Sequence, residues 1–410
     1  MIIKSTFLKN VLVLFRGNVL FQVIVILTLM FLTQHYSIEK IGRYAVFISI
    51  ISILSTVAPG RLEMAIMLPK KESEAHHVFI ASILSILSIC LLFVLISFLL
   101  YALNIFFKVG ELKTLVLLFF GILLVALCSL QTQYLNRHEK FGHVSNGKTI
   151  AAIIICFIQV ASIYYFASVF GLVLGYVLGF LSCAIYYQLK LLPHFKNKTT
   201  SFNKVKTVFR IYKKFPTINN LSSLLNILAN QGPVIVLEIV FGSAISGFYS
   251  VMQKTLNAPV SLIGAAFSQV FYKKVASEGA SLNLKKFMLK TTKGLLILSL
   301  VILCAVFILS DFMYVLIFGK EYIVSAAMAK IMVFFFITRL MFVSQNALLV
   351  ARNKLVLDLK FNFMFVIAII SPIILASIFN WSWSSCLTVM AIFGTVVFLY
   401  LGYILLKKIE

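Results

Sequence analysis

Long apolar runs recur along the whole chain, and their length constrains the fold more than any other feature of the sequence. Each run is roughly 20 residues long, which matches the hydrocarbon thickness of a bilayer when the chain is helical. The chain has 410 residues, of which 61% are hydrophobic and only 12% are charged, and a soluble protein of this length needs a larger polar surface. The sequence therefore predicts an all-α polytopic membrane protein. No cleavable signal pattern precedes the first run, so we expect this run to be retained.

Twelve of these runs are long enough to span a bilayer, and the charges between them predict their orientation. The runs lie near residues 11–33, 42–68, 77–103, 114–135, 149–167, 170–189, 216–240, 244–271, 291–310, 324–350, 356–379 and 385–406. Most of the 36 basic residues fall in every second loop, and both terminal segments belong to this basic side. Cytoplasmic loops carry an excess of Lys and Arg, so we expect both termini in the cytoplasm.

The longest loop divides the runs into two groups of six. We expect an N-terminal six-helix bundle over residues 1–190, a basic cytoplasmic linker over 191–215 and a C-terminal six-helix bundle over 216–410. Within the linker, Phe202, Val205 and Phe209 recur at helical spacing between Lys and Arg residues. This pattern predicts an amphipathic helix on the inner membrane surface, with its cations near anionic headgroups. A plain linker that obeys the charge rule is the simpler interpretation of the same residues.

The two halves of the chain resemble each other weakly. QTQYLNRHEK from Gln131 matches QNALLVARNK from Gln345, and GRY at Gly42 matches GFY at Gly247. A repeat of half the chain length predicts two similar bundles. Because each half has an even number of spans, we expect parallel repeats related by a pseudo-twofold axis along the membrane normal.

The stretch GHVSNGKT, Gly142 to Thr149, fits the phosphate-binding pattern G-x-x-x-x-G-K-[ST]. A working phosphate loop needs a strand before it, a helix after it and a soluble domain around it, and no loop of this chain has room for such a domain. We therefore interpret the match as chance, with the stretch in a cytoplasmic loop, Gly147 as a loop residue and Lys148 as a positive-inside anchor. The net charge of +24 lies mostly in loops and the six cysteines lack metal-ligand spacing, so no nucleic acid, nucleotide, cofactor or metal ion is expected.

Three basic residues lie well inside the predicted spans and away from the loops and span edges: Arg61, Lys254 and Arg339. A lone charge at the bilayer centre costs roughly 2.5–3.5 kcal/mol on insertion scales, so such residues usually face a polar cavity or a partner. Together the three would place cations at different depths in a central cavity, which suits a large anionic substrate. The alternative is that each is structural and pairs with a backbone carbonyl or with one of the carboxylates Glu63, Glu238 and Asp311.

Arg61 lies in the segment PGRLEMAIMLPK, which contains two helix-breaking residues. Pro59 and Gly60 should kink or break the helix and free backbone carbonyls. Glu63 follows Arg61 by two positions, and residues two apart do not share a helix face. A direct pair between Arg61 and Glu63 is therefore not expected in a regular helix.

The segments around these charges resemble a known family. IGRYAVFISIISILSTVAPGRLEMAIMLPKKESEA, which contains R-x-E-x-A-I-x-L-P from Arg61 to Pro69, is similar to the first-half signature of the Wzx-type polysaccharide flippases. SGFYSVMQKTLNAPVSLIGAAFSQVFYKKVASE is similar to their second-half signature, and the two stretches together cover under a fifth of the chain. The resemblance implies the fold of the multidrug/oligosaccharidyl-lipid/polysaccharide exporter superfamily.

The resemblance also implies a transporter and not an enzyme. Its implied substrate is undecaprenyl-pyrophosphate carrying an oligosaccharide repeat unit, moved from the inner to the outer leaflet of the bacterial inner membrane by alternating access for O-antigen or capsule synthesis. In that family, basic residues in the cavity hold the pyrophosphate, and the matching position in this chain is Arg61. We add Lys254 and Arg339 as candidate binding residues because of their depth in the predicted spans and their charge. Glu63 and Glu238 are candidates for coupling to an ion gradient. Membrane lipids, a polysaccharide polymerase and a chain-length regulator are candidate partners.

Other functions stay open. An ion-coupled drug exporter of the same fold would place carboxylates at its central positions, because its substrates are often cationic. A polysaccharide polymerase or ligase, which is an enzyme, typically carries a large outer loop with Arg and His, whereas the longest outer loops here have about a dozen residues. A peptidoglycan-precursor flippase usually has two further spans.

Overall fold

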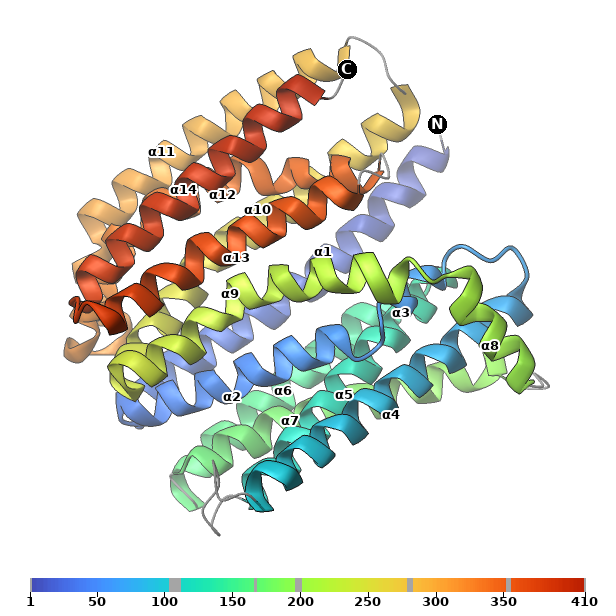
Figure 1. The fold of residues 1–410 in the computed structure, drawn as a ribbon, viewed down its shortest axis with the longest axis horizontal. Coiled ribbons are helices and arrows are strands. Elements are labelled where there is room, and N and C mark those ends of the chain that lie inside the picture. The colour runs from blue at the N-terminus through green and yellow to red at the C-terminus, as the bar shows by residue number, and fades with distance from the viewer. Residues whose placement is uncertain are drawn as a thin grey trace. The chain divides into compact units, whose positions relative to one another are not determined.

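The protein is described by a computed structural model that covers residues 2–102, 112–165, 168–195, 201–278, 283–351 and 355–408. This part of the chain is built from helices and contains no β-strand, which confirms the prediction of an all-α protein (Figure 1). Eleven helices within it are long and apolar enough to cross a membrane, judged by length and composition. The contacts within the chain divide it into two compact units.

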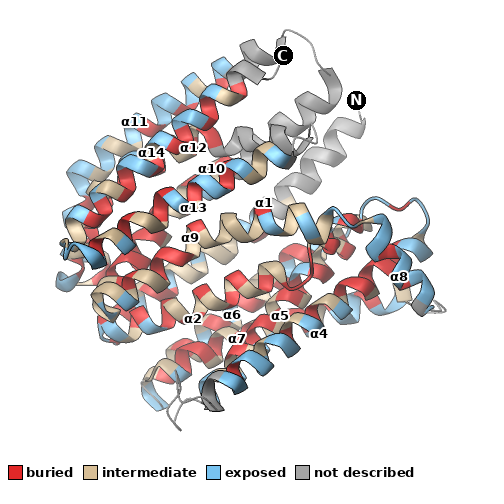
Figure 2. Cartoon of the chain, in the orientation of Figure 1, coloured by how far each residue is buried: buried red, intermediate tan, exposed pale blue. Residues whose placement is uncertain are grey.

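Unit 1 comprises residues Met1–Tyr36 and Phe47–Leu224. Its elements are α1 (Ile2–Thr33), the second part of α2 (Ile38–Val57), α3 (Leu62–Ala65), α4 (Glu72–Ala102), α5 (Leu112–Arg137), α6 (Phe141–Tyr165), α7 (Val169–Phe195), α8 (Phe202–Ile211) and the short π-helix η2 (Phe215–Asn219). Helix α6 packs against both α1 and α7, and α5 packs against α7 and α4. Figure 2 shows the buried residues of this unit on the sides where its helices meet.

Unit 2 comprises residues Ser37–Val46 and Leu225–Glu410. Its elements are the first part of α2, most of α9 (Asn220–Phe241), α10 (Ser243–Glu278), α11 (Asn283–Phe318), the turn η3 (Lys320–Tyr322), α12 (Ile323–Ala351), α13 (Leu355–Ile378) and α14 (Trp383–Lys408). Helix α12 is central, because it packs against α10, α11 and α14. Its Phe335 joins Phe361, Phe365 and Phe398 in an aromatic core.

Helices α2 and α9 contribute residues to both units. α2 belongs to unit 2 up to Val46 and to unit 1 from Phe47 onward, while α9 passes from unit 1 to unit 2 after Leu224. Each unit therefore contains a helical segment from the other half of the sequence. The predicted domain limits at residues 190 and 216 stay a prediction.

The second predicted span, 42–68, is wrong in its last third. Helix α2 ends at Val57, and α3 begins only at Leu62. Gly60 and Arg61, which lie between them, both have positive φ angles, at 64° and 55°. An α-helix requires negative φ, so the backbone cannot continue as one rod through these residues.

The stretch GHVSNGKT lies inside α6, so the prediction of a loop at this position is wrong. A helical backbone from Phe141 onward cannot form the strand, loop and helix of a phosphate site. Gly147 is needed for packing, because a Cβ at this position would clash with the ring of Tyr187. The Lys148 Nζ donates a hydrogen bond to Asn18 Oδ1 at 2.7 Å and so links α6 to α1.

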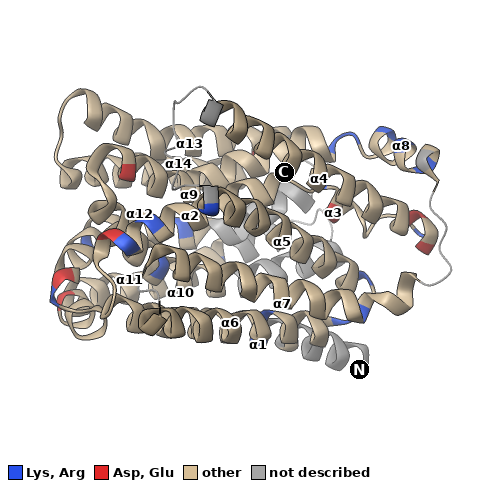
Figure 3. Ribbon diagram, turned by 90° about the horizontal axis from the view of Figure 1, so that it is seen from below, with Lys and Arg blue, Asp and Glu red and all other residues tan. Residues whose placement is uncertain are grey.

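Residues Phe202–Ile211 of the basic linker form the helix α8. Its Val205 and Val208 are buried, and the helix packs against α4. Lys204, Lys206 and Arg210 are exposed. Figure 3 shows Lys and Arg positions in blue along α8. The position of α8 on a membrane surface stays a prediction.

The repeated motifs GRY and GFY contact each other in unit 2. A Cβ on Gly42 in α2 would clash with the Ser243 carbonyl oxygen, and a Cβ on Gly247 in α10 would lie 2.5 Å from the Ile38 carbonyl oxygen. The two helices therefore approach with their backbones in contact, which small residues permit in membranes. The matching QNALLVARNK stretch ends in residues 352–354, which lie outside the described residues.

We expect Gly42→Ala to destabilise the protein, because the added methyl group meets a backbone oxygen that cannot move aside. Overpacking of this kind costs about 1–3 kcal/mol, and a lower midpoint of thermal unfolding in detergent would report it. Gly294→Ala is the matched control, because a Cβ at this position in α11 meets nothing within 4 Å. Equal midpoints for the two variants would contradict the packing role of Gly42.

Candidate functional site

The candidate site begins at the break between α2 and α3. Gly60 has φ 64° and Arg61 has φ 55° and ψ 9°, so both lie in the left-handed region. Glycine adopts this region freely, whereas a side chain with a Cβ pays about 1–3 kcal/mol to be held there. Arg61 is therefore in a conformation that its surroundings must stabilise.

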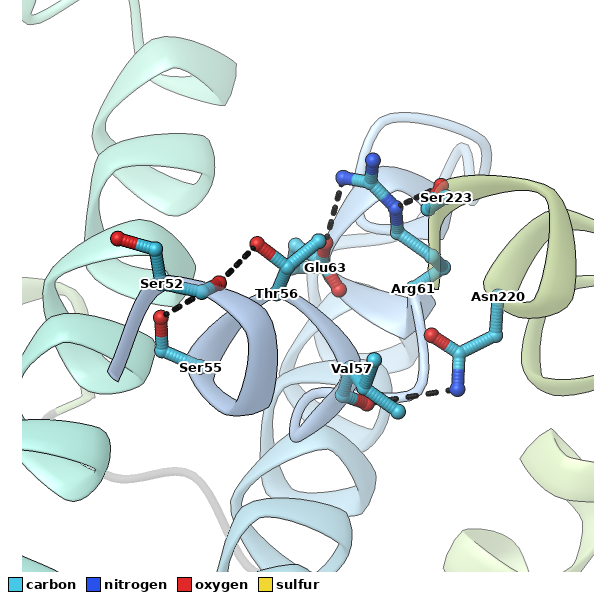
Figure 4. Close-up of polar contacts among 8 residues, drawn as sticks. All are labelled: Ser52, Ser55, Thr56, Val57, Arg61, Glu63, Asn220 and Ser223. Atoms are coloured by element: carbon cyan, nitrogen blue, oxygen red, sulfur yellow. Dashed lines mark hydrogen bonds and ion pairs between the residues drawn. The ribbon is translucent and has the colours of Figure 1, made fainter. Parts of the chain in front are cut away.

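The surroundings supply hydrogen bonds to the open end of α2. Ser85 Oγ, from α4, donates to the Ala58 carbonyl oxygen at 2.8 Å, and Asn220 Nδ2, from the start of α9, donates to the Val57 carbonyl oxygen at 3.4 Å (Figure 4). The last carbonyls of a helix have no partner within the helix, and inside a bilayer they have no water either. These two side chains therefore allow the helix to end within unit 1.

The Arg61 guanidinium extends between α3 and α9 (Figure 4). Its Nε donates to Ser223 Oγ at 2.6 Å, and one of its terminal nitrogens lies 3.5 Å from Glu63 Oε1. The Arg61 side chain is 25% exposed, whereas the Glu63 side chain is only 2% exposed. A direct pair is not expected in a regular helix, but the helix is broken here, and the left-handed backbone at Arg61 turns its side chain toward Glu63 in the first turn of α3, as the structural alternative allowed.

Glu63 lies outside the eleven long helices, in a position where burial opposes its ionisation. Burial raises the pKa of the Glu63 carboxyl above its ordinary value, and the adjacent Arg61 guanidinium partly offsets this effect. The second carboxyl oxygen is buried and has no hydrogen-bond partner among the residues that the structure describes. Protonation of Glu63 would remove the negative charge that holds Arg61 and leave the guanidinium available to another anion.

Arg137 is a further charged residue of this region, which the sequence indicated only as a loop cation. It lies at the end of α5, and its two terminal nitrogens each donate at 2.8 Å, one to the Ile66 carbonyl oxygen and one to the Pro69 carbonyl oxygen. Its Nε donates to Glu72 Oε2 at 3.1 Å. The guanidinium therefore binds the segment between α3 and α4 at three points, namely Ile66, Pro69 and Glu72.

Glu72, at the start of α4, holds Arg137 within a larger cluster. Tyr134 Oη donates to Glu72 Oε1 at 2.6 Å, and His138 Nε2 lies 3.1 Å from the same oxygen. The His138 ring stacks on the His194 ring with centroids 4.0 Å apart. These contacts join the start of α4 and the ends of α5 and α7. Arg137, which binds the segment after α3, belongs to the same cluster.

Lys254 lies in unit 2, on α10, two turns after Gly247. Its Nζ lies 5.5 Å from the ring centroid of Tyr44 on α2, a distance that allows a cation–π interaction. Asp311 and Glu238 have other partners in the described part of the chain. Asp311 Oδ2 lies 2.6 Å from Lys330 Nζ, and Glu238 Oε1 accepts a hydrogen bond from Ser243 Oγ at 2.7 Å.

Arg339 also lies in unit 2, on α12. Its Nε is buried and has no hydrogen-bond partner in the part of the chain that is described. The structure therefore places Lys254 and Arg339 in one unit and Arg61 with Glu63 in the other, and the predicted ladder of three cations stays a prediction.

Comparison with known proteins identifies one family and one fold. A family model described as "Polysaccharide biosynthesis protein" matches residues 32–327. No curated protein matches the chain. The chain is similar to the solved structure of a multidrug resistance MATE family transporter of the MOP superfamily, with TM-score 0.66 and 13% identity over 95% of this chain and 96% of that one. It is also similar to the lipid II flippase MurJ, with TM-score 0.68 and 14% identity over 98% and 87%.

We expect Arg137→Lys to destabilise the segment between Ile66 and Glu72 almost as much as Arg137→Ala. Lysine keeps the charge but lacks the planar fork that reaches two carbonyls and a carboxylate together. Loss of hydrogen bonds from a charged donor costs about 1.5–3 kcal/mol. Faster trypsin cleavage after Lys70 or Lys71 and a lower unfolding midpoint would report the loss.

The control for this comparison is Lys140→Ala, which removes an exposed cation close to Arg137 in the sequence. It should leave both measurements unchanged. If Arg137→Lys behaved like the native chain, charge alone would suffice and the role of the fork would be refuted.

Proposed function

We propose that this chain, which belongs to the family of polysaccharide biosynthesis proteins, is a flippase for lipid-linked oligosaccharides. Its substrate is undecaprenyl-pyrophosphate carrying a repeat unit of an O-antigen or capsule. It moves this lipid from the inner to the outer leaflet of the bacterial inner membrane by alternating access, with both termini in the cytoplasm. A polysaccharide polymerase and a chain-length regulator are its proposed protein partners.

The observation that carries this proposal is the environment of Arg61. The residue stands at a helix break in a membrane protein, is partly exposed, and binds only a serine hydroxyl and a distant carboxylate oxygen within the described residues. A guanidinium presents five donors in a planar fork, which matches the oxygens of a phosphate. We assign Arg61 to the pyrophosphate, which cannot cross hydrocarbon unaided.

Lys254 and Arg339 are the further cations of the proposed path. Lys254 is held by an uncharged aromatic ring, and Arg339 keeps one buried donor unpaired among the described residues. Neither arrangement neutralises the positive charge, so both side chains keep the capacity to attract an anion. This supports an anionic substrate over the cationic substrates of many drug exporters, although the fold is common to both.

Ion coupling is proposed for Glu63 and not for Glu238. Glu63 is buried and has a cation within reach, so a change in its charge is felt by Arg61. Glu238 is bonded to Ser243 at the turn between α9 and α10, where it fits a structural role. Protonation of Glu63 from one side of the membrane would thus be linked to anion binding by Arg61.

We expect Arg61→Ala to abolish most of the transport. Loss of hydrogen bonds from a charged group costs about 1.5–3 kcal/mol, which corresponds to about 10–100-fold weaker binding. The measurement is the amount of undecaprenyl-linked single repeat units in lipid extracts, together with surface polysaccharide, in cells that express the variant at normal level. Repeat units should accumulate while surface polymer falls.

Lys70→Ala is the control, because Lys70 is an exposed cation in the same segment. It should leave both quantities unchanged. Normal surface polysaccharide with altered drug tolerance would favour a drug exporter. Single units that reach the surface without polymerising would favour a polymerase.

We expect Glu63→Gln to strengthen binding of undecaprenyl pyrophosphate and to remove its dependence on pH. In the native protein the carboxylate competes for Arg61 above its raised pKa, which lies above 4.5, and releases it below that pKa. Binding should therefore strengthen as the pH falls through this range, whereas the glutamine variant should bind tightly throughout. Titration of the purified protein at several pH values tests this, and an unchanged pH profile in the variant would refute the competition.

A further inference from the structure

A chain of amide side chains joins three helices of unit 2. Asn226 Nδ2, on α9, donates to Asn362 Oδ1 on α13 at 2.9 Å. Asn230 Nδ2, one turn further along α9, donates to the Asn226 carbonyl oxygen at 2.7 Å and lies 3.2 Å from Asn226 Oδ1. Gln253 Nε2, on α10, donates to the Asn230 carbonyl oxygen at 2.5 Å. We call these four residues the amide cluster.

The amide cluster lies beside a weakened point of α9. Pro233 lies inside this helix and has no N–H, so the Ala229 carbonyl oxygen lacks its usual partner four residues later. The hydrogen bond from Gln253 reaches the next carbonyl, that of Asn230. Irregular backbone at membrane depth occurs where it is buried in protein or lines a polar cavity.

The hydrogen bonds that join the helices do not use all the donors and acceptors of the amide cluster. Each amide offers two donors and one oxygen with two acceptor sites, more than the bonds within the cluster use. Asn230 Oδ1 is buried and has no partner within the described ranges, which is unfavourable because a buried acceptor has lost its hydrogen bonds to water. Asn226 and Asn230 are half-buried, so their amides are not fully enclosed by the unit. A site for a polar ligand explains these properties together.

The chemistry of the amide cluster selects an uncharged ligand rich in hydroxyl groups. A cation site in proteins usually contains carboxylates, and the cluster has none. An anion needs donors without acceptors close by, whereas each amide presents both. A sugar hydroxyl donates one hydrogen bond and accepts two, which an amide can match on both counts.

We propose that Asn226, Asn230 and Gln253 bind the sugar hydroxyls of the transported lipid-linked oligosaccharide. This inference rests on the proposed function and deepens it, because it assigns the uncharged sugar part of the substrate to the residues of the amide cluster. The amide cluster then contributes to the choice of repeat unit, whereas Arg61 binds the pyrophosphate common to every such lipid.

The test compares two probes on the purified full-length protein in detergent. One probe is the undecaprenyl-pyrophosphate-linked repeat unit isolated from the host, and the other is undecaprenyl pyrophosphate without sugar. Asn226→Ala should weaken binding of the sugar-bearing probe about tenfold, the effect of about one lost hydrogen bond, and leave the sugar-free probe unchanged. Asn146→Ala, an exposed amide on α6, is the control and should change neither affinity.

Other results of this binding comparison would overturn the sugar assignment. Equal weakening of both probes, or no weakening of either, overturns the sugar assignment. Stabilisation by sodium ions that Asn226→Ala abolishes would show a cation site and would also overturn it. If Asn226→Ala does not fold, Asn230→Ser provides the same comparison, with the same results expected and the same results overturning the assignment.

The same measurement separates this inference from the proposed function. Arg61→Ala should weaken both probes, because both contain the pyrophosphate. If it weakened neither while Asn226→Ala still weakened the sugar-bearing probe, the role of Arg61 would fail and the sugar site would stand. If only Arg61→Ala had an effect, the flippase proposal would stand and the sugar site would fail.

Discussion

The need to satisfy backbone polar groups without water governs the region around Arg61. A helix that stops at Val57 exposes carbonyl oxygens, and side chains from α4 and α9 donate to them. Beside these donors, Gly60 and Arg61 adopt positive φ angles, and the Arg61 guanidinium reaches Ser223 and Glu63. The side chain of Arg61 is thus positioned by the polar groups around the helix break.

Two arginines of unit 1 differ in how completely protein groups occupy their donors. Arg137 donates to two carbonyl oxygens and to Glu72, so its guanidinium is committed to protein groups. Arg61 has a hydroxyl and a carboxylate oxygen at 3.5 Å, and its side chain stays partly exposed. A ligand anion can compete for Arg61 far more easily than for Arg137, because Arg137 would leave buried carbonyl oxygens without a partner if it bound the anion.

The sequence predicted the features that depend on local pattern. Apolar run length predicted the helical membrane fold, spacing predicted α8, and the residues Pro59 and Gly60 predicted a break before Arg61. The sequence offered Glu63 as one of several possible partners for Arg61, but it could not show that the two pair, since the contact depends on a left-handed φ angle at Arg61. The partners of Arg137 lie 68 and 71 residues away, and Asn226 contacts Asn362 across 136 residues. No periodicity within one helix carries such information.

Charged and uncharged groups are therefore organised differently in this protein. Arg61 and Glu63 are neighbours in sequence, so their interaction depends on one short segment and on the helices that hold it. The amide cluster draws on α9, α10 and α13, so replacement of one side chain alters the pattern of donors and acceptors without changing any charge. If the sugar is recognised by such a cluster, its specificity can change while the binding of the pyrophosphate is preserved. One fold can then transport different repeat units on a common lipid carrier.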